Sequence, residues 1–412
     1  MKKYDSKKEE GKQEENESRS VMEEILRNGA QKMLQKAIEW EVSEYLLKNE
    51  KAKDEEGYRL VVKNGWRKPR NLQTGIGDIE IEQPRVNDKR EGRKFVSNII
   101  PKYARRSPSI EALIPALYLA GVSSNNFKNA LESILGKKAK GLSAGSILRL
   151  KTIWEKEYQE WSKRDLSMKQ YVYWWADGIY FNVRLSDERP CFLVIMGALI
   201  DGTKELITIW DGERESKLSW KEALSDLKKR GLKEAPKLAI GDGGLGFWAA
   251  MEEEYSKVDQ QRCWVHKTAN ILDKLPKSVQ RSAKNLIHEM YMSPGKEKAL
   301  QSYEEFLRLY EAKYPKACEC LRKDKEVLFS FYSYPAEHWV HIRTTNPIES
   351  TFATVRHRTR QTKGCGSRMA TLTMVYKLAL EAEKHWIKMR AYNLIEKIIK
   401  GIRFIDGIEA AA

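Results

Sequence analysis

The spacing of apolar residues changes near residue 171, where alternation replaces a helical period. Aromatic and β-branched runs, joined by short polar turns such as DGTK, predict three consecutive strands at 171–185, 191–200 and 204–210. Helix and strand patterns then alternate, with a helix at 216–229, a strand at 237–241, a helix at 246–255 and a strand at 261–265. A meander of three strands followed by this alternation predicts an α/β layer fold of the ribonuclease H type.

The N-terminal region reads differently. Residues 1–20 carry six basic and six acidic side chains and almost no apolar ones. Such a segment buries too little apolar surface to offset the entropy of ordering, so we expect a disordered tail. Apolar positions between residues 21 and 47 recur at intervals of three and four, which predicts an amphipathic helix. Residues 21–57 are therefore an N-terminal helical region and a candidate for dimerisation.

A small basic segment follows at residues 58–107. Between residues 59 and 106 there are thirteen Lys/Arg against five Asp/Glu, a difference of +8, which is half of the net charge of +16. The alternation in GDIEIEQPRV predicts a strand of a β-hairpin. A concentrated positive charge on a hairpin is typical of a surface that binds DNA phosphates.

Three helical patterns follow the hairpin, at 109–120, 124–135 and 143–161. Gly121 and Gly136 separate them, and serines stand where helix caps are needed. This spacing favours a helix-turn-helix-like DNA-binding region over residues 108–165. The helix that opens at Ser143 is expected to enter the major groove.

The bulk composition agrees with a nucleic-acid partner. The chain has 412 residues, enough for two or three domains, and an isoelectric point near 9.3. Its positive charge indicates a polyanionic partner, and no apolar run approaches the ~20 residues that span a bilayer. The N-terminus lacks the apolar stretch of a signal peptide, so we expect a soluble cytoplasmic protein that associates with the cell's DNA. Five cysteines, an odd count, fit reduced thiols better than disulfides.

Three acidic residues lie where a carboxylate is unexpected. Asp177 interrupts the apolar run YVYWWADGIYFNVRL, where an unpaired charge is costly. Asp242 ends the short strand of PKLAIGDGG, and Glu349 lies on the first turn of a helix in RTTNPIEST. In the predicted sheet the first strand is central and the fourth lies beside it, so the two aspartates can approach each other. Two aspartates and a glutamate are hard oxygen ligands of the kind that Mg²⁺ prefers, which predicts a metal-dependent enzyme acting on nucleic acid phosphodiesters.

The spacing of these acids predicts an insertion. Asp242 follows Asp177 by 65 residues, which leaves room for two strands and a helix. Glu349 follows Asp242 by 107 residues, too many for a single strand-and-helix link. We therefore expect a catalytic core in two parts, residues 166–275 and residues 341–412. The mainly helical residues 276–340 form the insertion between them.

Each acid also has a structural alternative. Asp177 precedes Gly178, and Asp-Gly is a common turn pair, although apolar alternation resumes beyond it. Asp242 lies in GDGG, which describes many turns. Asn346, Pro347 and Glu349 suit the N-cap, N1 and N3 positions, where a glutamate completes a capping box. Only the joint occurrence of the three acids in compatible elements favours the metal site.

The segment CWVHK offers a second pair of functional residues. Cys263 and His266 have zinc-ligand spacing, but a zinc site needs about four ligands. Cys318 and Cys320 are the nearest further cysteines, and their spacing does not suit a zinc knuckle. We expect Cys263 to be a core residue and His266 to support the active site as a donor to a phosphate or an aspartate.

Basic residues surround the predicted metal-binding glutamate. Six Lys/Arg and one acid, Glu349, lie between residues 341 and 368, which favours contact with DNA phosphates over a merely solvated helix face. A tryptophan between two histidines is placed to stack on a displaced base, although core packing is the alternative. The predicted DNA contacts are Lys267, Trp339, Arg343, Arg356, Arg358, Arg360 and Lys363 and, in the basic segment, Arg67, Lys68 and Arg70.

Several segments resemble one known family. GDGGLGFWAAMEEEY, QQRCWVHKTANILDKLPKS, YPAEHWVHIRTTNPIESTFATVRHRTRQTKGCGSR and the upstream NGWRKPRNLQTGIGDIEIEQPRV look like the mutator-type transposases of bacterial insertion sequences. The likeness runs from about residue 58 to residue 377. By this resemblance Asp177, Asp242 and Glu349 correspond to the family's DDE metal-binding triad, and Cys263 with His266 to its C/DxxH motif.

The resemblance implies a reaction and its partners. Water activated by Mg²⁺, for which Mn²⁺ can substitute, cuts double-stranded DNA at the element's terminal inverted repeat. The freed 3′-hydroxyl then attacks a phosphodiester of the target DNA. Both steps are in-line displacements at phosphorus, and one metal pair can serve both. Because two element ends must be held together, we expect a homodimer or a larger homo-oligomer.

Two other functions compete with this one. A structure-selective nuclease of the same fold would cut DNA without joining it, but it has less need for the base-reading region predicted upstream. A DNA-binding repressor derived from a transposase would need no acidic triad. Both alternatives predict DNA binding, and only the transposase predicts joined products.

Overall fold

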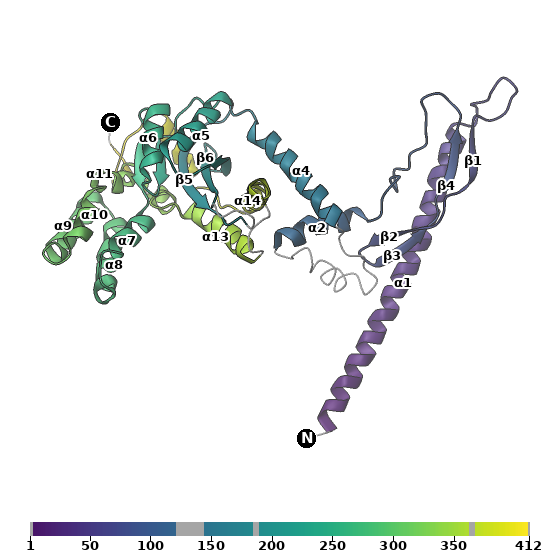
Figure 1. The fold of residues 1–412 in the computed structure, drawn as a ribbon, viewed down its shortest axis with the longest axis horizontal. Helices are drawn as coiled ribbons and strands as arrows, with labels where there is room; N and C mark the ends of the chain where they lie inside the picture. The colour runs from purple at the N-terminus through teal and green to yellow at the C-terminus, as the bar shows by residue number, and fades with distance from the viewer. Residues whose placement is uncertain (1–2, 121–143, 184–188, 362–366, 411–412) are drawn as a thin grey trace. The chain divides into compact units, whose positions relative to one another are not determined.

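A computed structural model describes residues 3–120, 144–183, 189–361 and 367–410 of the chain (Figure 1). The protein has a mixed α/β fold that divides into two compact units, Met1–Leu148 and Arg149–Ala412. The division falls within one helix, α4 (Ala144–Ser162). Each unit is described by itself.

The first unit contains a long helix, two pairs of strands and a shorter helix. The helices are α1 (Lys3–Lys48) and α2 (Pro108–Ala120), and the strands are β1 (Val61–Trp66), β2 (Arg70–Thr74), β3 (Gly77–Ile81) and β4 (Pro84–Asp88). β1 pairs antiparallel with β4, and β2 with β3. A small core joins α1 to the β2–β3 hairpin through Ile38, Leu72, Ile79 and Ile81. The alternation in GDIEIEQPRV is thus that of a hairpin strand, β3.

The structure differs from one prediction for the first unit and agrees in part with another. The disordered tail predicted for residues 1–20 differs from the structure, in which α1 begins at Lys3. Low hydrophobicity was the basis of that prediction, but Glu, Lys and Gln are also good helix formers, so the composition alone does not decide between the two states. α2 and α4 match the first and third predicted helices of the helix-turn-helix pattern. The middle helix, at 124–135, lies outside the described residues.

The second unit is built on a five-stranded mixed sheet. Its strands are β5 (Tyr171–Tyr180), β6 (Cys191–Leu199), β7 (Lys204–Gly212), β8 (Leu238–Gly241) and β9 (Asp259–Arg262), in the order β7-β6-β5-β8-β9. β5 is antiparallel to β6 and parallel to β8, and β9 is parallel to β8. The first strand is therefore central and lies beside the fourth, as the sequence predicts.

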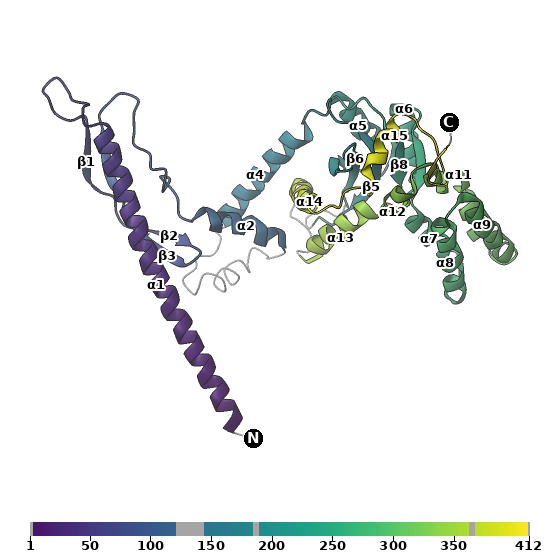
Figure 2. The same cartoon turned by 180° about the vertical axis from the view of Figure 1, so that it is seen from behind.

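Helices cover both faces of this sheet (Figure 1). α5 (Lys217–Lys229) and α6 (Leu245–Glu254) pack on one face, and α13 (Asn346–Gln361) and α14 (Arg368–Glu383) on the other, which Figure 2 shows from behind. The pleat of β5 divides its side chains between these faces. Trp174 and Ala176 belong to the core under α5, whereas Tyr173 and Trp175 belong to the core under α13. Two steps beyond Trp175, Asp177 lies on the α13 face.

A helical segment follows β9. It comprises α7 (Trp264–Leu272), α8 (Lys277–Met292), α9 (Lys296–Tyr310), α10 (Pro315–Arg322), α11 (Lys325–Leu328) and α12 (Trp339–Ile342). Its buried side chains, such as Ile287 and Phe306, form one continuous core with the α13 face of the sheet. The chain ends in α15 (Ile395–Ile399) and a short hairpin of β10 (Phe404–Ile405) and β11 (Ile408–Glu409).

One predicted strand is wrong in its bounds. The sequence predicts a strand at 261–265, but β9 ends at Arg262 and helix α7 begins at Trp264. Trp264, Lys267 and Ile271 are buried at intervals of three and four, which is a helical period. Cys263 and His266 therefore lie at the start of a helix rather than on a strand.

Candidate active site

Strand pairing sets Asp177 beside Asp242. Ala176 of β5 is paired with Gly241 of β8, and each aspartate is the next residue in its chain. Asp177 is itself paired with Val194 of β6, and β5 continues to Tyr180, so Asp177 lies within a strand and not in a turn. Asp242 does lie in a turn, where its Oδ1 accepts a hydrogen bond from the Gly244 backbone N–H at 2.8 Å. That turn holds the Asp242 carboxylate next to the centre of the sheet.

The Asp177 carboxyl group is buried without a hydrogen-bonding partner. Its residue is 9% exposed, and none of the described residues donates a hydrogen bond to it. Burial raises its pKa to about 7; the charges of Asp242 and Glu349 raise it further, and those of His266 and Arg356 oppose the shift. The three predicted acids are therefore within electrostatic range of one another.

Glu349 is positioned by the first turn of α13. The backbone N–H groups of Ile348 and Glu349 donate to the Thr345 carbonyl at 2.9 and 3.0 Å, so Thr345, and not Asn346, occupies the cap position. The Thr345 hydroxyl donates to Glu349 Oε1 at 2.6 Å. Glu349 is thus one residue beyond the position of a capping-box glutamate, and its carboxylate is held by a side chain.

Cys263 and His266 join Glu349 at the start of α7. The Thr345 backbone N–H donates to Cys263 Sγ at 3.3 Å, and the Thr345 hydroxyl oxygen lies 3.2 Å from the same sulfur. His266 Nδ1 lies 3.6 Å from Glu349 Oε1. The hydrogen bond to Cys263 raises the pKa of His266 to about 9, and the charges of Glu349 and Asp177 add to this shift against burial. Burial raises the pKa of the Cys263 thiol, but hydrogen bonds with His266 and Thr345 outweigh it and lower the pKa. The histidine is therefore a cationic donor at neutral pH.

The ligand atoms of Cys263, His266 and Glu349 lie within 4.8 Å of one another. Among the described residues this compact group has three members, fewer than the four ligands of a structural zinc site, so the zinc alternative gains no support. The carboxylates of Asp177, Asp242 and Glu349 do not form so compact a group. However, Asp177 is buried, unpaired and faced by two further acids, which is an environment that fits a divalent cation.

A fourth acid belongs to this cluster and was missed by sequence reasoning. Glu215 lies in the loop between β7 and α5, and its side chain is half-buried. Burial raises its pKa to about 7, and the charges of Asp242 and Asp177 raise it further. Its context, DGERESK, is a charged loop like many others, and the one usable signal was its position between the third strand and the first helix of the predicted fold.

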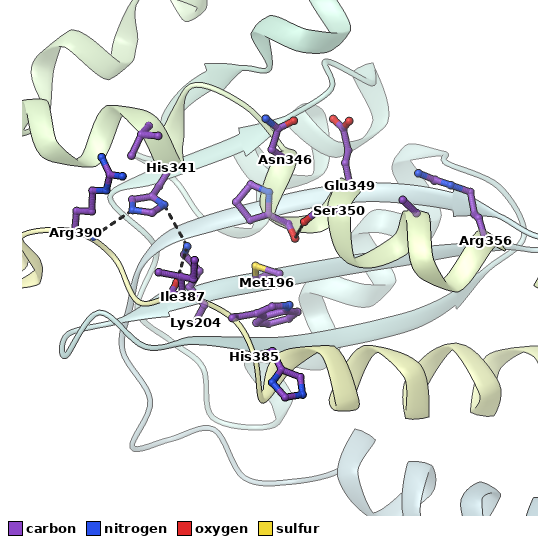
Figure 3. A pocket seen from close by; sticks show the side chains of 14 residues that line it. Met196, Lys204, His341, Asn346, Glu349, Ser350, Arg356, His385, Ile387 and Arg390 are labelled. Carbon is purple, nitrogen blue, oxygen red and sulfur yellow. Dashed lines mark hydrogen bonds between the residues drawn. The ribbon is translucent and has the colours of Figure 1, made fainter. Parts of the chain in front are cut away.

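A basic cavity of about 740 Å³ opens beside Glu349. Figure 3 shows Glu349 and Arg356 on α13 along one wall, and Lys204, His341 and Arg390 at the other end. Lys204 Nζ donates to the Ile387 carbonyl at 3.0 Å and lies 3.3 Å from His341 Nδ1. Burial lowers the pKa of Lys204 to about 8. Glu349 is the single acid among the lining residues, so the cavity favours an anionic ligand.

The structure argues against two predicted DNA contacts. Trp339 is 8% exposed, and its indole N–H donates to the Tyr334 carbonyl at 2.8 Å, so it is a core residue. Lys267 is 2% exposed, and its Nζ lies 2.7 Å from Asp324 Oδ2. Lys267 is on the buried face of helix α7. The sequence pattern did not predict a helix here, so it did not predict that Lys267 would be buried.

The other predicted contacts fall into three groups. Arg343 is half-buried, and its Nε donates to the Trp339 carbonyl at 3.1 Å, which gives it a structural role. Arg356 is exposed on α13 and lines the basic cavity. The side chains of Arg358 and Arg360 and all of Lys363 lie outside the described part of the structure.

The three predicted DNA contacts of the basic segment differ in exposure and in their hydrogen bonds. Arg67 and Lys68 are exposed in the connection between β1 and β2. The Arg70 guanidinium donates to the carbonyls of Lys102 at 3.0 Å and Pro101 at 3.3 Å, and so ties the start of β2 to the segment before α2. Arg67 and Lys68 are therefore the better candidates for contact with phosphates.

A mixed sheet that holds two aspartates near a glutamate, one of them buried without a hydrogen-bonding partner among the described residues, beside a basic cavity is suited to metal-assisted chemistry on a phosphate-bearing substrate. Residues 1–389 match the family model described as Transposase, Mutator family, and the chain belongs to this family of insertion sequence transposases. Membership implies an enzyme of DNA transposition that cuts DNA and transfers it, with a divalent metal cation. No helix in the described residues is both long and apolar enough to cross a membrane.

The chain is similar to named transposases over most of its length. It is 50% identical over 295 residues to the transposase for insertion sequence element IS6120 of Mycolicibacterium smegmatis, which covers 72% of this chain and 91% of the relative. It is 49% identical over 290 residues to the transposase for insertion sequence element IST2 of Acidithiobacillus ferrooxidans, covering 69% and 96%. A more distant relative, 26% identical over 373 residues (89% and 92%), is the transposase for insertion sequence element IS256 in transposon Tn4001 of Staphylococcus aureus.

Proposed function

We propose that this protein binds the terminal inverted repeats of its insertion sequence, cuts DNA there and joins the freed 3′ ends to target DNA through a DDE active site. Asp177, Asp242 and Glu349 are the proposed triad. The observation that carries this proposal is the buried Asp177 carboxyl group, which has no hydrogen-bonding partner among the described residues and faces both other acids. A protein that only binds DNA gains nothing from such an arrangement.

The proposed catalytic fold is ribonuclease H-like. The strand order β7-β6-β5-β8-β9, with three antiparallel strands followed by two parallel ones, supports this assignment. The proposed core consists of residues 166–275 and 341–412, and residues 276–340 are its helical insertion. α8 to α10 lie within that insertion, and their shared core with the sheet supports an insertion into the catalytic fold.

Asp177, Asp242 and Glu349 would hold Mg²⁺ or Mn²⁺. When bound, the ion supplies Lewis-acid activation of the attacking hydroxyl and stabilises charge at the phosphorus. Thr345 holds Glu349 through its hydroxyl and Cys263 through its backbone N–H, and so fixes α13 against α7. His266, a cationic donor between these residues, supplies positive charge next to the phosphate in the proposed complex.

The basic cavity supports a path for a DNA strand to the proposed active site. Arg356 and Arg390 extend from its walls, and we propose that they contact phosphates next to the scissile bond. In the first unit, Arg67 and Lys68 are the proposed phosphate contacts of the basic hairpin, and residues 108–165 are the proposed base-reading region. This division assigns the proposed chemistry to the second unit and most of the proposed DNA recognition to the first, with the base-reading region extending into the second unit through α4.

A homodimer or larger homo-oligomer would hold the two element ends together. Exposed apolar side chains on α1 support this proposal. They include Ile25, Met33 and Trp40, which are 65%, 73% and 68% exposed. Such a stripe on one helix is suited to pack against the same helix of another copy.

One assay tests the function. The purified protein is incubated with labelled DNA that carries its own element end, with Mg²⁺ or with EDTA, and Asp242→Ala is compared with the exposed control Asp273→Ala. We expect cutting at the repeat boundary and joined products only with metal and only when Asp242 is present. Cutting without joining indicates a nuclease, and specific binding without either step indicates a repressor. Equal activity of Asp242→Ala and wild type contradicts the proposed triad.

A further inference from the structure

Glu215 reaches the candidate active site from a loop that none of the three proposed ligands occupies. It precedes Ser216, whose hydroxyl accepts a hydrogen bond from the Ser219 backbone N–H at 3.2 Å and caps α5. The Glu215 backbone N–H lies 3.4 Å from the Tyr180 hydroxyl, to which it donates, and this contact ties the loop to the end of β5. Because α5 already has its cap, helix capping does not explain the Glu215 carboxylate.

Two glycines leave the space that this carboxylate occupies. A Cβ added to Gly178, the residue after Asp177, would lie 2.7 Å from Glu215 Cδ. A Cβ added to Gly244, in the turn that holds Asp242, would lie 3.2 Å from Glu215 Oε1. Neither glycine has a left-handed backbone conformation. The close approach of Glu215 therefore explains the absence of a side chain at Gly178, and Glu215 and Asp242 together crowd the position at Gly244.

The charge around Glu215 is unbalanced. None of the described residues donates a hydrogen bond to its carboxylate, and its charged neighbours are Asp242, Asp177 and the single cation His266. Asp177, one of these neighbours, is 9% exposed and has no hydrogen-bonding partner among the described residues. The N-terminus of α5 offsets part of the cost. Buried carboxylates that face each other without cations are costly, and a bound divalent ion removes that cost.

We propose that Glu215 is a fourth carboxylate ligand of the divalent metal site formed by Asp177, Asp242 and Glu349. This inference rests on the proposed function, because it adds a ligand to the same site. Four carboxylates near one another supply the hard oxygen ligands and the negative charge that a divalent metal site requires. Glu215 comes from the loop that precedes α5, whereas Glu349 comes from the first turn of α13.

The test measures metal binding to the full-length protein without DNA. Mn²⁺ is titrated into each variant, and free Mn²⁺ is followed by electron paramagnetic resonance. We expect Glu215→Gln to weaken Mn²⁺ binding by about 10-fold or more, and we expect the same of Asp177→Asn. Glu213→Gln is the matched control, since Glu213 is exposed in the same loop, and it is expected to bind like wild type.

The variants separate failure of this inference from failure of the proposed site. If Glu215→Gln binds Mn²⁺ like wild type while Asp177→Asn does not, Glu215 is not a ligand and the proposed site stands. If Asp177→Asn also binds like wild type, both proposals are wrong. Gly178→Ala is a second variant that keeps the carboxylate but displaces it, and it is expected to weaken binding in the same direction.

A stability measurement excludes a merely structural role. In EDTA the melting temperature of Glu215→Gln should equal or exceed that of wild type, because the substitution removes charge repulsion. With saturating Mn²⁺ the order should reverse, because wild type gains more from the bound ion. A lower melting temperature in EDTA, with unchanged Mn²⁺ affinity, would assign Glu215 to the stability of the loop instead.

Discussion

Asp177 and Asp242 directly follow two residues that are paired across neighbouring strands, Ala176 of β5 and Gly241 of β8. Neighbouring strands lie about 4.8 Å apart, so the register of two parallel strands alone fixes the backbone positions of both aspartates. Strands of a packed sheet are rigid supports for ligands. Asp177 and Asp242, which the sheet positions, are therefore the residues of the candidate site that the sequence predicts best.

Removing the Asp177 charge is expected to stabilise the metal-free protein. Its pKa of about 7 lies above the ordinary value of 3.8, so the native state binds more protons than the unfolded state between these pH values. The stability of wild type should then fall as pH rises from about 4 to 7. Asp177→Asn should be more stable than wild type at pH 8 by roughly 1–3 kcal/mol, with little difference at pH 4, as measured by urea unfolding in EDTA.

Asp273→Asn is the control for this experiment. Asp273 is exposed at the end of α7. Its substitution is expected to leave the change in the free energy of unfolding between pH 4 and pH 8 the same as in wild type. A loss of stability in Asp177→Asn at pH 8 would show that the carboxylate makes favourable interactions in the metal-free protein. That result would remove the main support for a cation at this position.

His266 is expected to titrate near pH 9. Because its pKa is raised above 6.5, its contribution to stability is fully present below pH 6.5 and is lost as pH rises through 9. Cys263→Ala should lower this pKa toward the ordinary value, since the hydrogen bond to Cys263 is its largest cause. Histidine NMR resonances test this, and the signal that disappears in His266→Gln gives the assignment.

His341 is an internal reference for the same titration. Burial, followed by the charge of Lys204, lowers its pKa to about 4, so these two histidines should shift in opposite directions. A His266 midpoint below 6.5 would contradict a cationic donor at the candidate active site. It would instead leave a neutral imidazole, which can coordinate a metal together with Cys263 and Glu349.

Asp177 and Glu215 differ in whether the local sequence alone marks them as unusual. Asp177 was visible because a charge within an apolar strand is costly wherever that strand lies. Glu215 was not, because its significance depends on Gly178 and Gly244 leaving room for it, a relationship between three loops and strands. A local sequence pattern shows whether a residue is unfavourable within its own helix or strand. It does not show which residues from distant elements the side chain will contact.

Lys267 and Trp339 illustrate the opposite error. Lys267 was among the predicted DNA contacts, and Trp339 was predicted to stack on a base because it lies between two histidines, but both side chains are buried in the core. The distinction depends on helical phase. In α7, Lys267 shares the buried face with Trp264 and Ile271 and pairs with Asp324, a residue from the distant helical segment. A strand assignment at 261–265 gave the wrong phase and hid this face.

Arg67 and Lys68 are expected to contribute to DNA affinity through charge. Replacing both with alanine should weaken binding to the element end and lower the slope of log affinity against log salt by about 2, since each phosphate contact contributes about 1. Fluorescence anisotropy over a range of salt concentrations measures both quantities. The charge-conserving pair Arg67→Lys and Lys68→Arg is the control and should keep the slope. A loss of affinity in this control would indicate that Arg67 reads a base and does not merely contact a phosphate.

Arg390 is expected to hold a DNA phosphate at the far end of the basic cavity from Glu349. Its backbone N–H donates to His341 Nε2 at 3.2 Å, which fixes the loop, while its exposed side chain lines the cavity. Arg390→Ala should weaken binding of the element end and reduce the salt slope by about 1 without changing the fold. Lys400→Ala is the control, since Lys400 lies outside the cavity and pairs with Glu396. Equal binding by both variants would show that the strand does not reach this end of the cavity and would leave Arg356, which lines the cavity on α13, as the proposed phosphate contact.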